Sequence, residues 1–302
     1  MNRLLIAFIG LALVAPQALQ AKAVEEKNVT SGKVKVDPAM GYILISGPER
    51  QQGMFIRVPD DESKRIYEDD RQKAFVKAQK RYKAELTTWR REVEVAQQNR
   101  LAPPDKPEVP KIETFTIDPI ELRDVESFGP FFVYSKGESI TYLNAVKPGT
   151  WIWYGPLFMA PNGGAMGTCQ CMGTVRFEVK PGVVTDLGTS LVDAPRWESE
   201  DDIDRLQLKQ ANAKRAAAGK EPLETLISGQ VRYGLPASLQ SWPSVRAELH
   251  ASPKMNNYYG VLVSRVAPIP GVLGYHRDVI VDERTGQEID SPTLVSRAKI
   301  KK

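Results

Sequence analysis

The chain has 302 residues, of which 42% are hydrophobic and 26% are charged, enough for one large or two modest domains with a buried core. Its 41 basic and 37 acidic residues give a net charge of +4. A nucleic-acid-binding face needs a concentration of basic residues that this small net charge does not indicate, so we expect no nucleic-acid partner. Two cysteines exclude a disulfide-rich scaffold, and a hydrophobic core must therefore hold the fold.

The first 23 residues have the pattern of a secretory signal peptide. Basic Arg3 precedes an apolar run from Leu4 to Ala15, and small residues follow at Ala21 and Ala23. The run is about half of the ~20 residues that a membrane-spanning helix needs. We predict cleavage after Ala23, with Ala21 as the other candidate, and a periplasmic or secreted protein without a transmembrane segment in the mature chain. The alternative is a retained membrane anchor.

Residues 24–37 are polar and predict a loose N-terminal segment. The runs at 41–47 and 53–59 are short, rich in β-branched and aromatic residues, and bounded by glycine and proline. This pattern predicts two strands joined by a turn.

Residues 61–101 predict one long helix, because positions 61–100 contain no glycine or proline and apolar residues recur every three or four positions. This apolar stripe consists of Phe75, Ala78, Tyr82, Leu86, Trp89, Val93 and Ala96. A proline-rich return at 102–112 then ends the helix, which indicates an insertion between strands of a β-domain. The basic face of this helix could contact an anionic envelope surface. The alternative is a solvated helix packed by its stripe on its own domain.

A β-rich region follows the return. Short runs of strand-forming residues, separated by turns containing glycine, lie at 113–118, 129–135, 139–146, 150–156, 173–182 and 184–192. Their spacing predicts an antiparallel sandwich that spans residues 38–192.

Residues 193–302 predict a C-terminal region that packs on this sandwich. A second helix is expected at 199–219, with Ser199 as N-cap and Gly219 just after its end. Residues 222–260 look irregular, and 259–271 and 275–289 predict a terminal hairpin or two more strands. The predicted fold class is therefore mainly β, α+β overall, with one long inserted helix and a shorter one.

The run LNAVKPGTWIWYG, followed by CQCMGTVRFEVKPGVVTDLG, resembles small β-sandwich domains of unknown function in bacterial envelope and secreted proteins. In those domains an aromatic strand follows KPG, and later strands end in PG and contain DLG. The resemblance covers roughly residues 38–60 and 128–192. It implies an exported β-sandwich and carries over no catalytic residue.

No catalytic residue is predicted. The two histidines, His250 and His276, lack motif partners, and no hydrolase, phosphate-binding or dinucleotide-binding motif is present. A hydrolase with members of its site far apart in sequence is the least favoured hypothesis.

Two tryptophans form a possible binding surface for a glycan. Trp151 and Trp153 fall on one face of a predicted strand, where paired indoles could stack on sugar rings. They could equally form the core of the sandwich, which is the favoured alternative.

The two cysteines, Cys169 and Cys171, are separated by one residue. They could be structural, form a local disulfide or redox pair, or bind Cu(I) together with Met166 or Met172. No cofactor is expected, with copper as the possible exception. The favoured function is a non-enzymatic module that binds or scaffolds an envelope protein or glycan. The alternative is a soft-metal or thiol-redox protein that uses the cysteine pair.

Overall fold

The computed structural model describes residues 22–161, 163–197, 202–222 and 227–291. Most of the predicted signal peptide and the predicted N-cap Ser199 lie outside these residues. Ala23, at the predicted cleavage point, belongs to a short edge strand and pairs with Asn144. No helix in the described ranges is long and apolar enough to cross a membrane.

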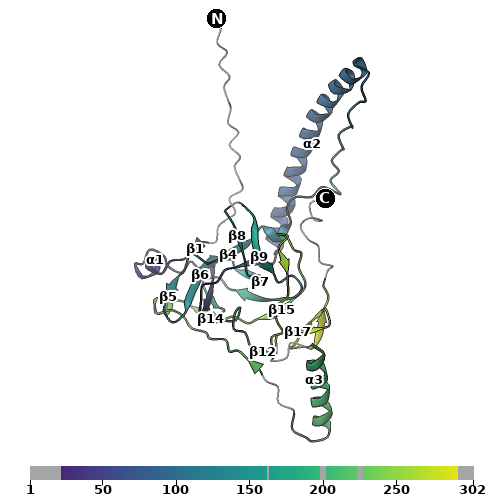
Figure 1. Cartoon of the computed structure of the whole chain (residues 1–302). Helices are drawn as coiled ribbons and strands as arrows, with labels where there is room; N and C mark the ends of the chain where they lie inside the picture. The colour runs from purple at the N-terminus through teal and green to yellow at the C-terminus, as the bar shows by residue number, and fades with distance from the viewer. Residues whose placement is uncertain (1–21, 162, 198–201, 223–226, 292–302) are drawn as a thin grey trace.

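The body of the molecule is a sandwich of one mixed and one antiparallel sheet (Figure 1). The first sheet has the order β1 (Lys22–Ala23), β6 (Ile140–Val146), β2 (Gly41–Gly47), β11 (Val184–Asp186) and β14 (Ser244–Arg246), with β5 (Ser135–Lys136) also paired to β6. The second has the order β15 (His250–Ser252), β10 (Thr174–Val179), β7 (Gly149–Gly155), β3 (Gly53–Arg57) and β4 (Val125–Phe128). Most pairs are antiparallel, but β11 runs parallel to both β2 and β14.

Three hydrophobic clusters hold this body together. The largest lies between the two sheets and includes Ile43, Phe55 and Phe177. A second covers the outer face of the first sheet around Leu44 and Trp242. The third covers the outer face of the second sheet and contains both cysteines. Because both sheets are covered on their outer faces, β2 and β3 are buried along their whole lengths.

Smaller elements complete the body. β8 (Leu157–Met159), β9 (Ala165–Cys169) and β16 (Leu262–Val263) form one small sheet, and β17 (Leu273–His276), β18 (Val279–Asp282) and β19 (Gln287–Ile289) form another. β12 (Arg196–Trp197) pairs with β13 (Ile227–Ser228). The short helices are α1 (Glu26–Thr30), η1 (Ile120–Leu122), η2 (Ala237–Leu239) and α3 (Asp202–Ala217).

The long helix α2 (Asp61–Gln98) stands away from the sandwich (Figure 1). Its 38 residues span ~57 Å. The segment 99–115 returns beside it, and we call α2 and this segment together the arm. The apolar stripe of α2 faces the returning segment: Phe75 stacks edge-on against Phe115, and the Trp89 indole N–H donates to the Pro104 carbonyl at 2.9 Å. The predicted stripe is confirmed, but its partner is the return segment rather than the sandwich.

A buried arginine fixes the root of the arm. Arg57, at the end of β3, forms ion pairs with Asp124 at 3.0 Å and with Asp60, and its Nε donates to the Pro148 carbonyl at 2.9 Å. Asp60 is the N-cap of α2 and accepts from the Ser63 backbone N–H at 2.8 Å. The helix therefore begins at a residue that is bonded to the sheet.

Several expected strands are present with small shifts at their ends: those at 41–47, 53–59, 139–146, 150–156 and 173–182 correspond to β2, β3, β6, β7 and β10. The predicted end of α3 is also confirmed, since Gly219 has a φ of +66° and follows the last helical turn. The expected hairpin between 259–271 and 275–289 does not form, because the strand in the first run, at Leu262–Val263, pairs with β9 instead. The alternative of further strands is confirmed, since β17, β18 and β19 pair with one another within residues 273–289.

Three other expectations were wrong. Residues 113–118 form no strand, because Phe115 packs on α2 instead of on a neighbouring strand. The expected strand at 129–135 is displaced to β4, because Pro130 has no N–H for a ladder, and Phe131 is 77% exposed. Of the expected strand at 184–192, only β11 forms.

The N-terminal segment and the C-terminal third both contribute residues to the body of the molecule. Residues 24–37 include α1, and Val24 is buried. β14 and β15 from the C-terminal third complete the edges of the two main sheets. The body is therefore built from both sides of the predicted boundary at residue 192.

Candidate functional site

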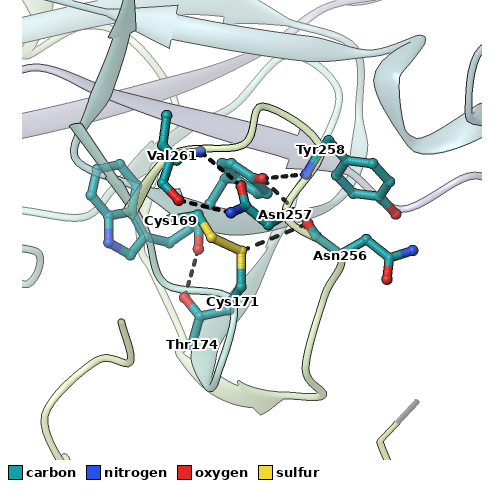
Figure 2. Close-up of a disulfide and its surroundings, with 9 residues drawn as sticks. Cys169, Cys171, Thr174, Asn256, Asn257, Tyr258 and Val261 are labelled. Atoms are coloured by element: carbon teal, nitrogen blue, oxygen red, sulfur yellow. Dashed lines mark hydrogen bonds between the residues drawn. A yellow bond between two sulfur atoms is a disulfide. The ribbon is translucent and has the colours of Figure 1, made fainter. Parts of the chain in front are cut away.

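The two cysteines form a disulfide at the junction of β9 and β10 (Figure 2). Cys169 ends β9, and a turn at Gln170 brings the Cα atom of Cys171 to 5.2 Å from that of Cys169. This separation lies within the range that a disulfide requires. Both residues are 0% exposed. The bond is therefore part of the third hydrophobic cluster.

Backbone hydrogen bonds join this disulfide turn to the segment 255–264. The carbonyls of Cys169 and Cys171 accept from the backbone N–H groups of Ser264 at 2.8 Å and Met255 at 3.0 Å. Met172 N–H donates to the Ser264 carbonyl at 3.0 Å. Because both cysteine carbonyls are used in this way, the turn and the facing segment hold each other in place.

A polar frame surrounds the sulfur atoms (Figure 2). The Cys171 sulfur lies 3.6 Å from the Asn256 carbonyl. The Tyr154 hydroxyl donates to that carbonyl at 3.2 Å and accepts from the Tyr258 N–H at 2.9 Å. Burial raises the pKa of both phenols, so these hydroxyls stay protonated. Asn257 bonds both backbone groups of Val261, at 2.7 and 3.1 Å, which closes the loop beside the disulfide.

The disulfide bears directly on the copper hypothesis. Bonded to each other, Cys169 and Cys171 have no thiolate for Cu(I). Met166, which is 56% exposed, lies three positions before Cys169 on β9, so the two side chains face opposite sides of the strand. Met172 follows the turn and is partly buried. Copper binding by these four residues stays a prediction that requires the bond to be reduced first.

The expected binding surface of Trp151 and Trp153 is not on the surface. The two residues are 1% and 5% exposed and lie in the cluster between the sheets. The Trp151 indole N–H donates to the Lys147 carbonyl at 2.9 Å, and the Trp153 ring contacts Phe55. Large aromatic side chains supply much of the buried area of such a core, which is the alternative favoured from the sequence. Neither indole face is free to stack on a sugar.

The two histidines lie on different elements. Nδ1 of His276, on β17, is 3.2 Å from the Glu288 carboxylate, and His276 is exposed. His250, on β15, has Glu248 at 3.8 Å and the Arg284 guanidinium at 3.4 Å. Each therefore has a surface carboxylate neighbour, and they do not share a site.

The middle of the arm is strongly basic. From Arg71 to Arg91, α2 has eight basic residues and one acidic residue, Glu85, a local net charge of +7 against +4 for the whole chain. With 3.6 residues per turn, Lys73, Lys77, Lys80 and Arg91 fall on the face opposite the apolar stripe, and all four are exposed. This basic face extends for about 30 Å.

Few of these charges are neutralised within the described ranges. Arg81 pairs with Glu85 at 2.7 Å, and Lys73 lies 3.8 Å from Asp70. Lys77, Lys80, Lys83 and Arg90 form no ion pair with any residue that the structure describes. Their charge is therefore available to an external anion.

Comparison with protein-family models, with curated proteins and with solved structures found no match to this chain.

Sequence patterns did not indicate the residues that hold the disulfide turn. The stretch 256–260, NNYYG, contains Asn257 before a glycine and is typical of a turn closed by an asparagine side chain. No local signal places this turn against cysteines about 85 positions earlier. Arg57 was missed because an arginine at a strand end ordinarily faces solvent.

Proposed function

We propose that this protein is an exported, non-enzymatic module of the bacterial envelope that uses its arm to hold an anionic envelope component. The single observation that carries the proposal is the exposed basic face of α2, formed by Lys73, Lys77, Lys80 and Arg91. It lies in the stretch from Arg71 to Arg91, where basic residues outnumber acidic ones by eight to one. The predicted signal peptide supports the compartment.

The construction of the arm suits a role in binding at a distance from the body. Its stripe is covered by the return segment, where Arg71 donates to the carbonyls of Ile112 and Phe115 at 2.8 and 3.2 Å. Its root is held by Arg57, and Arg123 pairs with Asp70, almost three turns further along the helix, at 2.7 Å. The basic face is thus presented on a helix supported at several points.

Membrane lipid is the anionic partner that we favour. A flat anionic surface can meet a straight basic face along its whole length, and each basic residue near such a surface contributes about 1 kcal/mol. A groove for a protein or a glycan would add apolar or aromatic contacts, but the exposed side of α2 between Lys73 and Arg91 is mainly charged and polar. Attraction of this kind weakens as salt screens it.

The soft-metal or thiol-redox alternative has less support. A redox pair needs an accessible sulfur, and both sulfurs here belong to fully buried residues.

The test is co-sedimentation of the mature protein with vesicles of phosphatidylcholine that contain or lack phosphatidylglycerol. The arm variant replaces the four residues of the basic face, Lys73, Lys77, Lys80 and Arg91, by glutamine, which keeps helix propensity and removes four charges. The matched control replaces four exposed lysines of the body, Lys33, Lys35, Lys136 and Lys180, by glutamine.

We expect the wild type and the control to bind only the anionic vesicles, with binding lost at high salt. The arm variant should bind at least ~10-fold more weakly than both. An equal loss of vesicle binding in the control would show that binding depends on the net charge alone, which would refute a specific role of the arm. If the wild-type protein does not bind the anionic vesicles, the proposal of a lipid partner is refuted.

A further inference from the structure

The distal end of the arm carries an apolar groove that is open to solvent. Its volume is about 430 Å³, and its wall consists mainly of Val95, Ala96, Leu101 and Ala102. Val95 is 55% exposed and Leu101 is 66% exposed. Figure 1 shows that this end of α2 lies far from the sandwich, so the described part of the body does not cover the groove.

A tight reversal of the chain builds this groove. The Leu101 N–H donates to the Ala96 carbonyl at 2.8 Å, and the Arg100 N–H donates to the Gln97 carbonyl at 3.2 Å. These two bonds end the helix and carry Leu101 back beside its last turn. Arg100 has a φ of +56°, a conformation in which glycine is usual. The reversal therefore presents an exposed leucine with a positive charge directly beside it.

The groove continues the basic face of α2. Val95 follows Arg91 by four positions, which places both residues on the same side of the helix. Lys73, Lys77 and Lys80 lie on this side too, and Arg91 itself lines the groove. An object that lies along the basic face therefore meets four cations, and then an apolar surface at the end of the arm.

This order of charge and apolar surface fits a phospholipid bilayer. Helices that lie on a bilayer keep basic residues at the phosphates and bury apolar side chains ~5–10 Å deep, at the boundary with the acyl chains. Arginine can lay its stem on apolar surface while its guanidinium stays in water, so Arg91 and Arg100 can bond phosphates beside an inserted leucine. Glu92 also lines the groove, but these two arginines outnumber it.

We infer that the end of the arm inserts Val95 and Leu101 into the acyl region of a phospholipid bilayer while the basic face stays at the phosphates. The inference rests on the function proposed above, to which it adds an apolar contact at a defined place. A weak apolar anchor and a basic patch hold a protein on a bilayer together better than either does alone.

The first test removes the apolar contact. Val95→Gln combined with Leu101→Gln changes two exposed side chains, so this tip variant should fold. The matched control combines Leu262→Gln with Val192→Gln, a leucine and a valine of the body that are 75% and 50% exposed. In co-sedimentation with vesicles of phosphatidylcholine and phosphatidylglycerol, the tip variant should bind at least ~10-fold more weakly than the wild type. The control should bind like the wild type.

The second test reports insertion directly. A thiol-reactive dye whose emission shifts to the blue in apolar surroundings is attached at Leu101→Cys, at Ala84→Cys on the basic face, or at Lys180→Cys on the body, each an exposed position. The native cysteines are bonded to each other and buried, so they do not take up the dye. Anionic vesicles should shift the emission most at position 101, less at position 84 and not at position 180.

The outcomes separate this inference from the proposed function. If anionic vesicles bind the wild type but the tip variant binds equally well, or the dye at position 101 does not shift, the arm binds by charge alone and the inference is overturned. If vesicles of phosphatidylcholine alone shift that dye as much as anionic ones, insertion is supported and the anionic partner is refuted. A shift that appears without vesicles as protein concentration rises would show that arms associate with each other, which would overturn the inference.

Discussion

Glutamine at position 126 should change how the stability of this protein depends on pH. Glu126 lies on β4, two residues before the buried Phe128 on the same strand face, and its Oε2 atom is buried without a hydrogen-bond partner among the residues that the structure describes. Burial is the main cause that raises the pKa of this carboxyl from 4.5 to about 8, the nearby Asp124 carboxylate raises it further, and Lys147 lowers it. Around neutral pH the folded protein therefore keeps a proton on Glu126 that the unfolded chain has lost.

The direction follows from proton linkage. Below pH 4.5 both states are protonated, and Glu126 contributes no pH dependence. Between pH 4.5 and about 8 only the folded state holds the proton, so the free energy of unfolding falls by ~1.4 kcal/mol per pH unit as pH rises. The difference between a pKa of 4.5 and one of about 8 amounts to about 5 kcal/mol at the alkaline end. Glu126→Gln removes this loss because its amide does not ionise.

The assay is urea unfolding, followed by tryptophan fluorescence, at several pH values from 4.5 to 8.5. Relative to the wild type, Glu126→Gln should gain stability steadily across this range, with most of the gain present by pH 8. Glu49→Gln, at an exposed glutamate, is the control and should run parallel to the wild type. Parallel curves for Glu126→Gln and the wild type would refute the reasoning.

Three further predictions concern the root of the arm and the disulfide. Arg57→Met should cost about 3 kcal/mol in urea unfolding, because it leaves the half-buried Asp124 carboxylate with Lys147 as its remaining ion-pair partner among the described residues, and adding Asp124→Asn should recover part of that loss. Asp60→Ala should cost ~1 kcal/mol by removing the N-cap, while Asp60→Asn should keep most of the cap. Hydrogen bonds from Ser63, and then from Arg57, lower the pKa of Asp60 to about 2. The stabilisation from its charge is therefore present above pH 3.8 and is lost as pH falls towards 2. In Asp60→Asn this loss of stability in acid should be absent. The Cys169–Cys171 bond should resist dithiothreitol in the native protein and be reduced in urea, as measured by thiol counting; rapid reduction without urea would contradict the burial of the sulfurs.

Local patterns predicted the elements that depend on local chemistry. β2 was predictable because a β-branched and aromatic run lies between glycines, and the stripe from Phe75 to Ala96 was predictable because its helical period persists over six turns. Gly219 was predictable because a helix commonly ends at a glycine with positive φ. Each of these signals lies within a few neighbouring residues.

Pairing over long distances could not be predicted in the same way. The parallel pairing of β11 with β2 joins residues about 140 positions apart, and no short-range signal specifies it. The exposure of Phe131 and the burial of Arg57 both run against average preferences, because tertiary contacts decide them. The disulfide was left open for the same reason, since the turn at Gln170 that allows it is held by Tyr154 on a neighbouring strand.

The position of the arm follows from polar contacts at its root as well as from its apolar stripe. The stripe holds only the return segment, which would leave the direction of a ~57 Å helix free if nothing else fixed it. Arg57, Asp60 and Asp124 supply that constraint, because each bonds across the junction between β3, α2 and β4. None of these three side chains lies on the basic face, so charges there can be removed without loosening the root. The arm variant therefore tests binding, and Arg57→Met tests stability, with no residue in common.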